Sequence, residues 1–212
     1  MQFRHQKFMF RLHKNTAENS GFRNILSDVY SALAKLLFLN YVCGQMNLIC
    51  FRTRTGLHKN FMRNILVTGG LGYIGSHTVV ELIKNGYTPI IIDNLSNTEI
   101  DVLARLESIT NHKLEYHNLD ICNGLALEEI FSKHNIDAVI HFAAFKAVGE
   151  SVENPLKYYL NNINGLNTLL NAMEKNKVKN IVFSSSCTVY GEPDFSPVNE
   201  NAVIKRANSP YG

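Results

Sequence analysis

Residues 65–75 read Ile-Leu-Val-Thr-Gly-Gly-Leu-Gly-Tyr-Ile-Gly, an apolar run that leads directly into a glycine-rich turn. The first three residues show no polar alternation, which is typical of a strand buried on both faces. Glycines at 69, 72 and 75 allow a tight turn, a close backbone approach to a pyrophosphate, and close packing of the next helix on the strand. The pyrophosphate would lie at the N-terminus of a helix that begins at Tyr73, where free amides favour an anion.

The same alternation of strand and helix continues to the end of the chain. Because each parallel crossover needs a covering helix, the order predicts an α/β fold, a doubly wound parallel sheet of the Rossmann type. After 65–67, apolar runs predict strands at 90–92, 114–117, 138–140 and 180–183. Helices are expected at 73–84, 99–109, 125–134 and 155–175.

Asp93 closes the second predicted strand, eighteen residues after Gly75. A carboxylate in this place accepts hydrogen bonds from the adenosine ribose and would repel a 2′-phosphate. Residues 94–101 contain no Arg or Lys to hold such a phosphate, so NAD is favoured over NADP. Asp120 and Ile121, after the third strand, could contact adenine, although Asp120 could equally cap the next helix.

Charge divides the 212-residue chain into two segments. Residues 1–61 carry nine Lys/Arg against two acids, a net charge of +7, whereas residues 62–212 have a net charge of −4. The basic segment 1–61 has no clear periodicity, so we expect an N-terminal extension outside the working fold, and Met62 is a candidate start. Residues 62–212 are expected to form the NAD-binding domain. Aromatic residues among the N-terminal basic residues do not suffice to indicate a nucleic-acid partner.

Cysteine spacing and hydropathy restrict the remaining possibilities. Cys43, Cys50, Cys122 and Cys187 show no zinc-type spacing, so no metal site is expected. Scattered cysteines in an α/β protein indicate a reducing, cytoplasmic location. The longest apolar stretch is too short to span a bilayer and no signal peptide opens the chain, so no membrane partner is expected.

Later motifs make the pattern specific. They are TGGLGYIGSH (68–77), HFAAFKAVGESV (141–152), YYLNNING (158–165), FSSSCTVYG (183–191) and SPYG (209–212). Together they resemble the UDP-glucose 4-epimerase family of extended short-chain dehydrogenases/reductases. The resemblance runs through residues 62–212 and does not include residues 1–61.

The resemblance implies a tightly held NAD⁺, with the glycine loop on the pyrophosphate and the strand ends around the ribose and adenine. It also implies that Ser186 and Tyr211 are catalytic and face the sugar. The cofactor-binding residues implied in this way are Gly69, Gly72, Tyr73, Ile74, Gly75, Asp93, Asn94, Leu95, Ser96, Asn97, Thr98, Asp120, Ile121, Phe142, Ala143, Ala144, Phe145, Lys146 and Asn161.

The implied reaction interconverts UDP-glucose and UDP-galactose, a step of galactose metabolism, by oxidation and re-reduction at sugar C4. Tyr211 would take the 4-hydroxyl proton, and Ser186 would hydrogen-bond the sugar oxygen. Tyrosine, with a reference pKa of ~10, needs a nearby cation to act as a base at neutral pH. The resemblance also implies a homodimer of the full-length protein, with residues 155–175 as a candidate contact.

Two departures from the family pattern lie at the end of the chain. The lysine expected four residues after Tyr211 and the C-terminal substrate lobe lie beyond Gly212. We therefore expect the 212-residue chain not to turn over by itself. Two alternatives stay open: a nucleotide-sugar 4,6-dehydratase, although Cys187-Thr188 replaces its Asp-Glu pair, and a non-catalytic NAD-binding module. His141, at a strand end, is expected to be structural.

Overall fold

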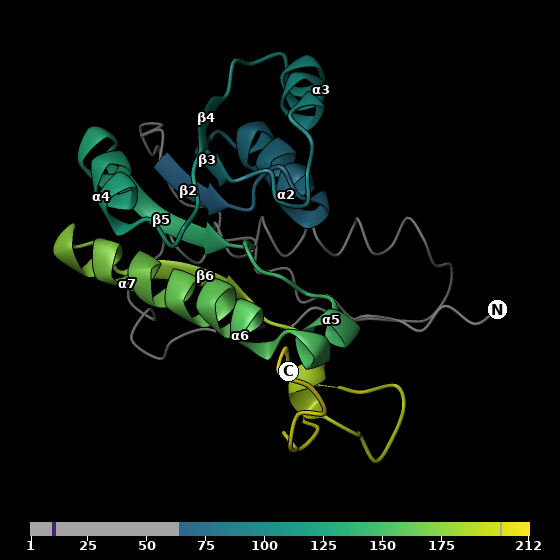
Figure 1. Cartoon of the computed structure of the whole chain (residues 1–212). Helices are drawn as coiled ribbons and strands as arrows, with labels where there is room; N and C mark the ends of the chain where they lie inside the picture. Colours follow the sequence, from purple (N-terminus) through teal and green to yellow (C-terminus); the bar gives the residue numbers. More distant parts are fainter. Residues whose placement is uncertain (1–9, 12–63, 200) are drawn as a thin grey trace, which may run out of the picture.

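A six-stranded sheet forms the centre of the protein (Figure 1). The structure is a computed structural model that describes residues 10–11, 64–199 and 201–212. The strand order is β1-β6-β5-β2-β3-β4, and all neighbours are parallel except β1, which runs antiparallel to β6. The strands are β1 (Phe10–Arg11), β2 (Asn64–Thr68), β3 (Thr88–Asp93), β4 (Glu115–Asn118), β5 (Ile136–His141) and β6 (Asn180–Ser184).

Helices cover both faces of the sheet, which confirms the doubly wound α/β fold. One face packs against α2 (Tyr73–Lys84) and α3 (Asp101–Thr110). The other packs against α4 (Gly124–Lys133) and α7 (Gly165–Lys175). The remaining helical segments are α5 (Val148–Glu153), α6 (Pro155–Tyr158), the π-helix η2 (Tyr159–Asn164) and the 3₁₀-helix η3 (Cys187–Tyr190).

The central strand β2 shows why the apolar runs predicted the sheet. Ile65 and Val67 belong to the core under α2 and α3, whereas Leu66 belongs to the core under α4 and α7. All three side chains are fully buried. Because successive strand residues point to opposite faces, a strand covered on both sides needs apolar residues at every position.

The helix expected at 155–175 is divided in the structure. A π-helical stretch, η2, separates α6 from α7, and the short α5 precedes them. Gly165 begins α7 in close contact with the loop after β4: a Cβ on this glycine would lie 2.6 Å from Ile121 Cδ1. The extra residue of a π-turn changes which side chains face inward, and such turns are frequent at functional sites.

The N-terminal segment contributes β1, whose Phe10 and Arg11 are in register with Ser184 and Phe183. Apart from these two residues, the segment 1–61 lies outside the described residues, so its expected separation from the fold stays a prediction. Among the helices that the structure describes, none has the length and hydropathy needed to cross a membrane.

Candidate nucleotide-binding site

A cleft of about 560 Å³ opens at the carboxyl ends of β2, β3, β5 and β6. Ligands of open parallel sheets bind at this edge, where the strand order reverses. The structure brings all the site residues expected from the sequence to the cleft wall except Leu95 and Asp120. Those on the wall are Gly69, Gly72, Tyr73, Ile74, Gly75, Asp93, Asn94, Ser96, Asn97, Thr98, Ile121, Phe142, Ala143, Ala144, Phe145, Lys146, Asn161, Ser186 and Tyr211.

Two glycines of the first loop are required by its geometry. Gly69 has φ +67°, a left-handed conformation, and its amide donates to Ile92 O at 2.8 Å. A Cβ on Gly75 would lie 2.1 Å from Gly69 O, well inside contact distance. The loop therefore closes against the first turn of α2 only because position 75 has no side chain.

The N-terminus of α2 presents free amides to the cleft. Gly72 is the N-cap and offers no side-chain acceptor. Ser76 N donates to Gly72 O at 2.8 Å, so the amides of residues 73–75 precede this first helical hydrogen bond. Tyr73, Ile74 and Gly75 all line the cleft. Amides at a helix N-terminus, together with the helix dipole, bind phosphate well.

The buried carboxylate of Asp93 connects two loops of the site. Its Oδ2 accepts from Leu71 N at 3.2 Å, in the glycine loop. Its Oδ1 accepts from Leu95 N and from Thr98 Oγ1, both at 3.0 Å, in the loop after β3. Asp93 is 7% exposed and lines the cleft. A carboxylate has about four lone-pair positions, so capacity remains for a ribose hydroxyl.

The two expected residues off the cleft wall have structural contacts. Asp120 Oδ2 accepts from Asn94 Nδ2 at 3.0 Å, and its Oδ1 accepts from Cys122 N at 2.8 Å. Leu95 packs against the core beneath α2 and α3 with φ 57°. Asp120 thus fixes the loops beside the cleft, whereas its neighbour Ile121 forms part of the wall.

The loop 142–146 is held in place by Asn162, a residue that the sequence interpretation missed. Asn162 Oδ1 accepts from Phe145 N at 2.9 Å, and its Nδ2 donates to Phe145 O at 2.8 Å. Asn161, its neighbour in η2, donates to Asn162 Oδ1 at 2.8 Å and lines the cleft. This two-sided amide contact keeps the loop extended, with exposed Lys146 at the cleft.

Ser186 and Tyr211 lie on opposite segments of the same cleft. Ser186 Oγ accepts from Thr188 N at 3.3 Å and from Thr188 Oγ1 at 3.0 Å. Tyr211 N donates to Ser151 Oγ at 3.3 Å, and its ring packs edge-on against Tyr158 with centroids 6.4 Å apart. The serine and tyrosine expected to be catalytic therefore share one cavity, although they are 25 residues apart in the sequence.

Further residues on the wall were not expected. They are Ile92, Leu119, Val148, Ser184, Ser185, Cys187 and Thr188. Most of them are direct sequence neighbours of a predicted site residue. The position of a residue next to a strand end therefore indicates that it lines the cleft. Cys187 among these wall residues is exposed.

His141 forms part of the support beneath the site, in agreement with the structural role expected for it. Its Nδ1 is hydrogen-bonded to Thr68 Oγ1 at 2.7 Å, and its ring stacks on Phe183 with centroids 5.6 Å apart. Thr68 Oγ1 also accepts from Ala143 N at 3.4 Å, which ties the ends of β2 and β5 together. Burial lowers the pKa of His141 to about 4, so its ring is neutral at pH 7.

Comparison with known proteins identifies the class. A sequence model of the family described as GDP-mannose 4,6 dehydratase matches residues 66–212, and the chain belongs to this family. Among curated proteins, the chain is 59% identical over 148 residues to a UDP-glucose 4-epimerase of Dictyostelium discoideum, covering 70% of this chain and 43% of that protein. It is 53% identical over 148 residues to a UDP-glucose 4-epimerase of Bacillus subtilis, covering 70% and 43%.

The similar solved structures also include UDP-glucose 4-epimerases. A Bifidobacterium longum UDP-glucose 4-epimerase in complex with NAD⁺ and UDP is similar with a TM-score of 0.68 and 44% identity, covering 70% of this chain and 44% of that one. A Stenotrophomonas maltophila UDP-glucose-4-epimerase with bound NAD and formylated UDP-arabinopyranose is similar with a TM-score of 0.67 and 46% identity, again covering 70% and 44%. The chain thus spans less than half the length of these relatives.

The low pKa of His141 predicts a pH dependence of stability. The pKa of about 4 in the folded protein lies below the unfolded value of about 6.5, so the unfolded state binds more protons as pH falls between these values. The stabilising contribution is complete above pH 6.5 and is lost towards pH 4. Urea unfolding should show that wild type loses about 2 kcal/mol more than His141→Gln between pH 7 and pH 5. An equal loss in both proteins would contradict a buried neutral ring.

Proposed function

We propose that this chain forms the NAD-binding part of a UDP-glucose/UDP-galactose 4-epimerase of galactose metabolism. One observation carries the proposal: a single cleft brings together a phosphate-binding helix N-terminus, a ribose acid, and the Ser186–Tyr211 pair. The similarity to several proteins named UDP-glucose 4-epimerase supports it. Because the chain spans less than half of those relatives, the activity and its UDP-sugar substrates are proposed for the whole protein.

The cleft fits a dinucleotide without a 2′-phosphate. The contact between Gly75 and Gly69 O excludes any side chain at the place where a pyrophosphate would lie on α2. Asp93, already fixed by three hydrogen bonds, places a negative charge where a 2′-phosphate would be repelled. Loop residues 142–146 and Asn161 continue the wall towards Ser186, so the remaining proposed cofactor contacts follow the length of NAD.

In the proposed reaction, NAD held in the cleft would supply the acceptor, and in its reduced form the donor, of the hydride at sugar C4. Tyr211 takes the proton of the 4-hydroxyl as the C4–H bond breaks, and gives it back when C4 is reduced from the opposite face. Ser186 Oγ hydrogen-bonds the same sugar oxygen and keeps it within reach of the phenol. Thr188 Oγ1 donates to Ser186 Oγ at 3.0 Å, which leaves the serine proton free to point at the sugar.

Several wider properties belong to the same proposal. Residues 62–212 form the NAD-binding domain, and residues 1–61 stand outside the catalytic fold apart from the edge strand β1 (Phe10–Arg11). The protein works in the cytoplasm without a nucleic-acid or membrane partner. The described residues carry the cleft entirely on segments from β2 onward, which supports the division near residue 62.

Two other functions remain as competitors. The family name favours a nucleotide-sugar 4,6-dehydratase, but Cys187 and Thr188 occupy the place of the Asp-Glu pair that would move protons at C5 and C6. Thr188 instead contacts Ser186. A non-catalytic NAD-binding module would need no paired serine and tyrosine at the cleft, so the convergence of Ser186 and Tyr211 favours the epimerase.

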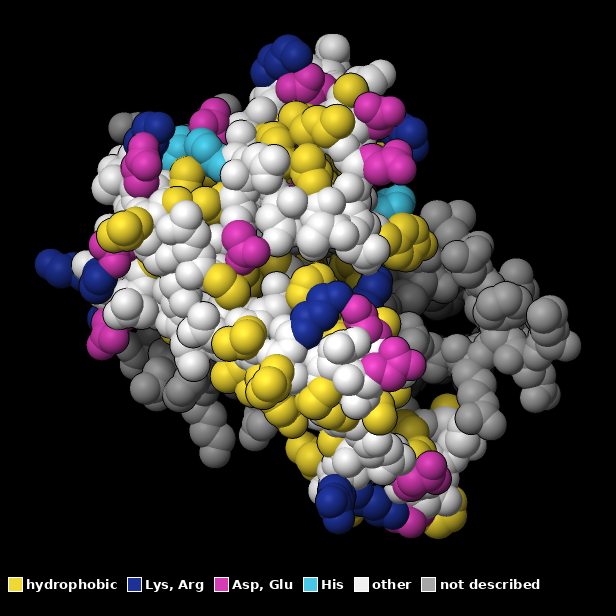
Figure 2. All heavy atoms as spheres, viewed as in Figure 1, with side chains coloured by type: hydrophobic (Ala, Val, Ile, Leu, Met, Phe, Trp, Pro, Cys, Tyr) yellow, Lys and Arg dark blue, Asp and Glu magenta, His cyan; other side chains and the backbone are white. Residues whose placement is uncertain are grey.

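The outer surface of α6, η2 and α7 supports the proposal of a homodimer. Leu156, Tyr159, Leu160, Ile163 and Leu170 are between 41% and 72% exposed. Figure 2 shows hydrophobic side chains gathered over this part of the molecule. Contiguous exposed apolar surface of this kind marks a contact site. We infer that a second copy of this chain covers the surface, because a two-fold dimer pairs the same helices of both subunits.

The cofactor proposal predicts the effect of one charge. Of the described residues that line the cleft, Lys146 alone has a cationic side chain. Lys146→Ala should weaken NAD⁺ binding to the apoprotein by about 5- to 10-fold, because an exposed cation on the wall of a cleft that holds an anionic dinucleotide contributes roughly 1 kcal/mol. Lys113→Ala, at a side chain 92% exposed and away from the cleft, is the control.

Titration calorimetry should also show NADP⁺ binding at least ~10-fold more weakly than NAD⁺; equal affinities would contradict the role of Asp93.

The catalytic proposal is tested on the whole protein. Tyr211→Phe should lower kcat for conversion of UDP-galactose to UDP-glucose by about 100-fold or more, because the proton acceptor is lost, while bound NAD stays at the wild-type level. Lys113→Ala, away from the cleft, should leave kcat unchanged. If Tyr211→Phe turned over at the wild-type rate, Tyr211 would not be the base. If the wild-type whole protein converted no UDP-hexose but bound NAD, the binding-module alternative would replace the epimerase.

The dimer proposal is tested by a charge on its surface. Leu156→Glu should convert the whole protein from dimer to monomer in light scattering, because a carboxylate buried in an apolar contact between two copies would lose its hydration without gaining a partner. Leu125→Glu, at an 83% exposed side chain on α4, should leave the mass unchanged. A wild-type monomer, or a Leu156→Glu dimer of unchanged stability, would exclude this surface.

A further inference from the structure

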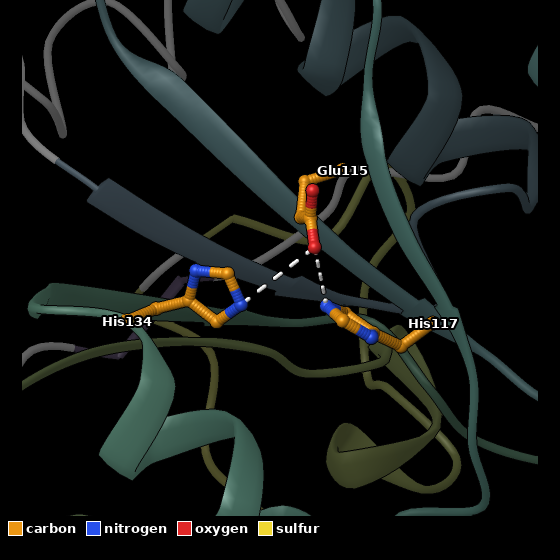
Figure 3. Close-up of side chains that lie close together, drawn as sticks. All are labelled: Glu115, His117 and His134. Atoms are coloured by element: carbon orange, nitrogen blue, oxygen red, sulfur yellow. Dashed lines mark ion pairs between the residues drawn. The ribbon is translucent and has the colours of Figure 1, made fainter.

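Glu115, His117 and His134 converge outside the nucleotide cleft (Figure 3). Glu115 and His117 lie two residues apart on β4, so their side chains share one face of the strand. His134 is the C-cap of α4 and projects towards them. We propose that these three side chains form a binding site for Zn²⁺ or a related divalent transition-metal ion. This site does not depend on the proposed function.

The three ligand atoms have suitable spacing. Glu115 Oε1 lies 3.1 Å from His117 Nε2 and 3.7 Å from His134 Nε2, and all three atoms are within 4.8 Å of one another. Ligands about 2.1 Å from a tetrahedral zinc are roughly 3.4 Å apart. Small rotations of the side chains would therefore bring all three atoms onto one ion. Two imidazoles and one carboxylate suit zinc, copper or nickel better than calcium or magnesium.

The two imidazole nitrogens both face the Glu115 carboxylate and lie close to each other. His117 Nε2 and His134 Nε2 are both buried, and neither makes a hydrogen bond within the described residues. Glu115 Oε1 lies 3.1 Å and 3.7 Å from them, distances that become ion pairs when the imidazoles are protonated. A buried polar atom without a partner is costly, and a metal ion bound to both nitrogens would remove this cost.

The surroundings favour the ligand form of the histidines. Burial lowers the pKa of His117, although Glu115 opposes this effect. The nearby cation Lys133 is 3.7 Å from Glu129 Oε1, which offsets part of its charge. The Glu115 side chain is 53% exposed, so a water molecule can complete the coordination.

The position of the cluster indicates a structural role. Glu115 begins β4, His117 is its third residue and pairs with Ile92 of β3, and His134 precedes β5. None of the three side chains lines the nucleotide cleft. The nucleotide cleft lies at the carboxyl ends of the strands. A metal ion here would connect the edge strand β4 to the end of α4 and take no part in chemistry at the sugar. The cysteine spacing that predicted no metal site is not relevant to this cluster, because it contains no cysteine.

The site is tested with Zn²⁺ alone and the full 212-residue chain, stripped of metal and free of any affinity tag. Equilibrium dialysis with metal analysis should give one tightly bound Zn²⁺ that depends on the cluster. His134→Gln and Glu115→Gln should each weaken this binding at least ~10-fold. His112→Gln, an exposed histidine on the loop after α3, should bind like wild type. At a Zn²⁺ concentration of about 100 times Kd, the Tm of wild type should rise by about 5–10 °C, and those of the two cluster variants much less.

Two readouts separate the site from weaker explanations. Co²⁺ should give the visible absorption of a four-coordinate nitrogen–oxygen site in wild type and in His112→Gln, but not in His134→Gln. Circular dichroism of the metal-free variants checks that they fold. If His134→Gln does not fold, Zn²⁺ binding by Glu115→Gln, which changes a half-exposed side chain, tests the site instead. No bound Zn²⁺ in wild type, or wild-type affinity in both cluster variants, would overturn the proposal.

Discussion

The contact between Gly75 and the carbonyl oxygen of Gly69 is the constraint on which the site depends. With a Cβ–oxygen separation of only 2.1 Å, no side chain can stand at residue 75 while the loop keeps its path. That path places the first turn of α2 directly after β2 and aims its free amides at the cleft. It also positions Leu71 N to reach Asp93, so the Asp93 carboxylate and the glycine-rich loop are fixed by one arrangement.

Much of this arrangement is readable from the sequence because it is local or fully buried. Ile65, Leu66 and Val67 are apolar because helices cover both faces of β2. Asp93 is recognisable because it ends the next strand along the chain, and strand ends of a parallel sheet meet at one edge. The bounds of α2 match the prediction for the same reason, since glycines precede the helix and Asn85-Gly86 follow it.

The parts that were missed depend on contacts distant in the sequence. The residues around Tyr159–Asn164 do not predict a π-turn. The helix after this turn begins at Gly165, which packs against Ile121, about 40 residues earlier in the sequence. Asn162 looks like its neighbour Asn161 until the fold brings Phe145 to it. Likewise, Glu115 and His134 form a cluster only after β4 and the end of α4 are placed side by side.

The π-turn also connects two surfaces through a single backbone segment. Asn161 and Asn162 face the loop 142–146, whereas Leu160 and Ile163 of the same turn are exposed on the outside. A rotation of the turn that shifts Leu160 or Ile163 also shifts the Asn162 amide that holds Phe145. Any free-energy coupling between the two surfaces acts equally in both directions. This short helix therefore carries residues of both surfaces on one backbone segment.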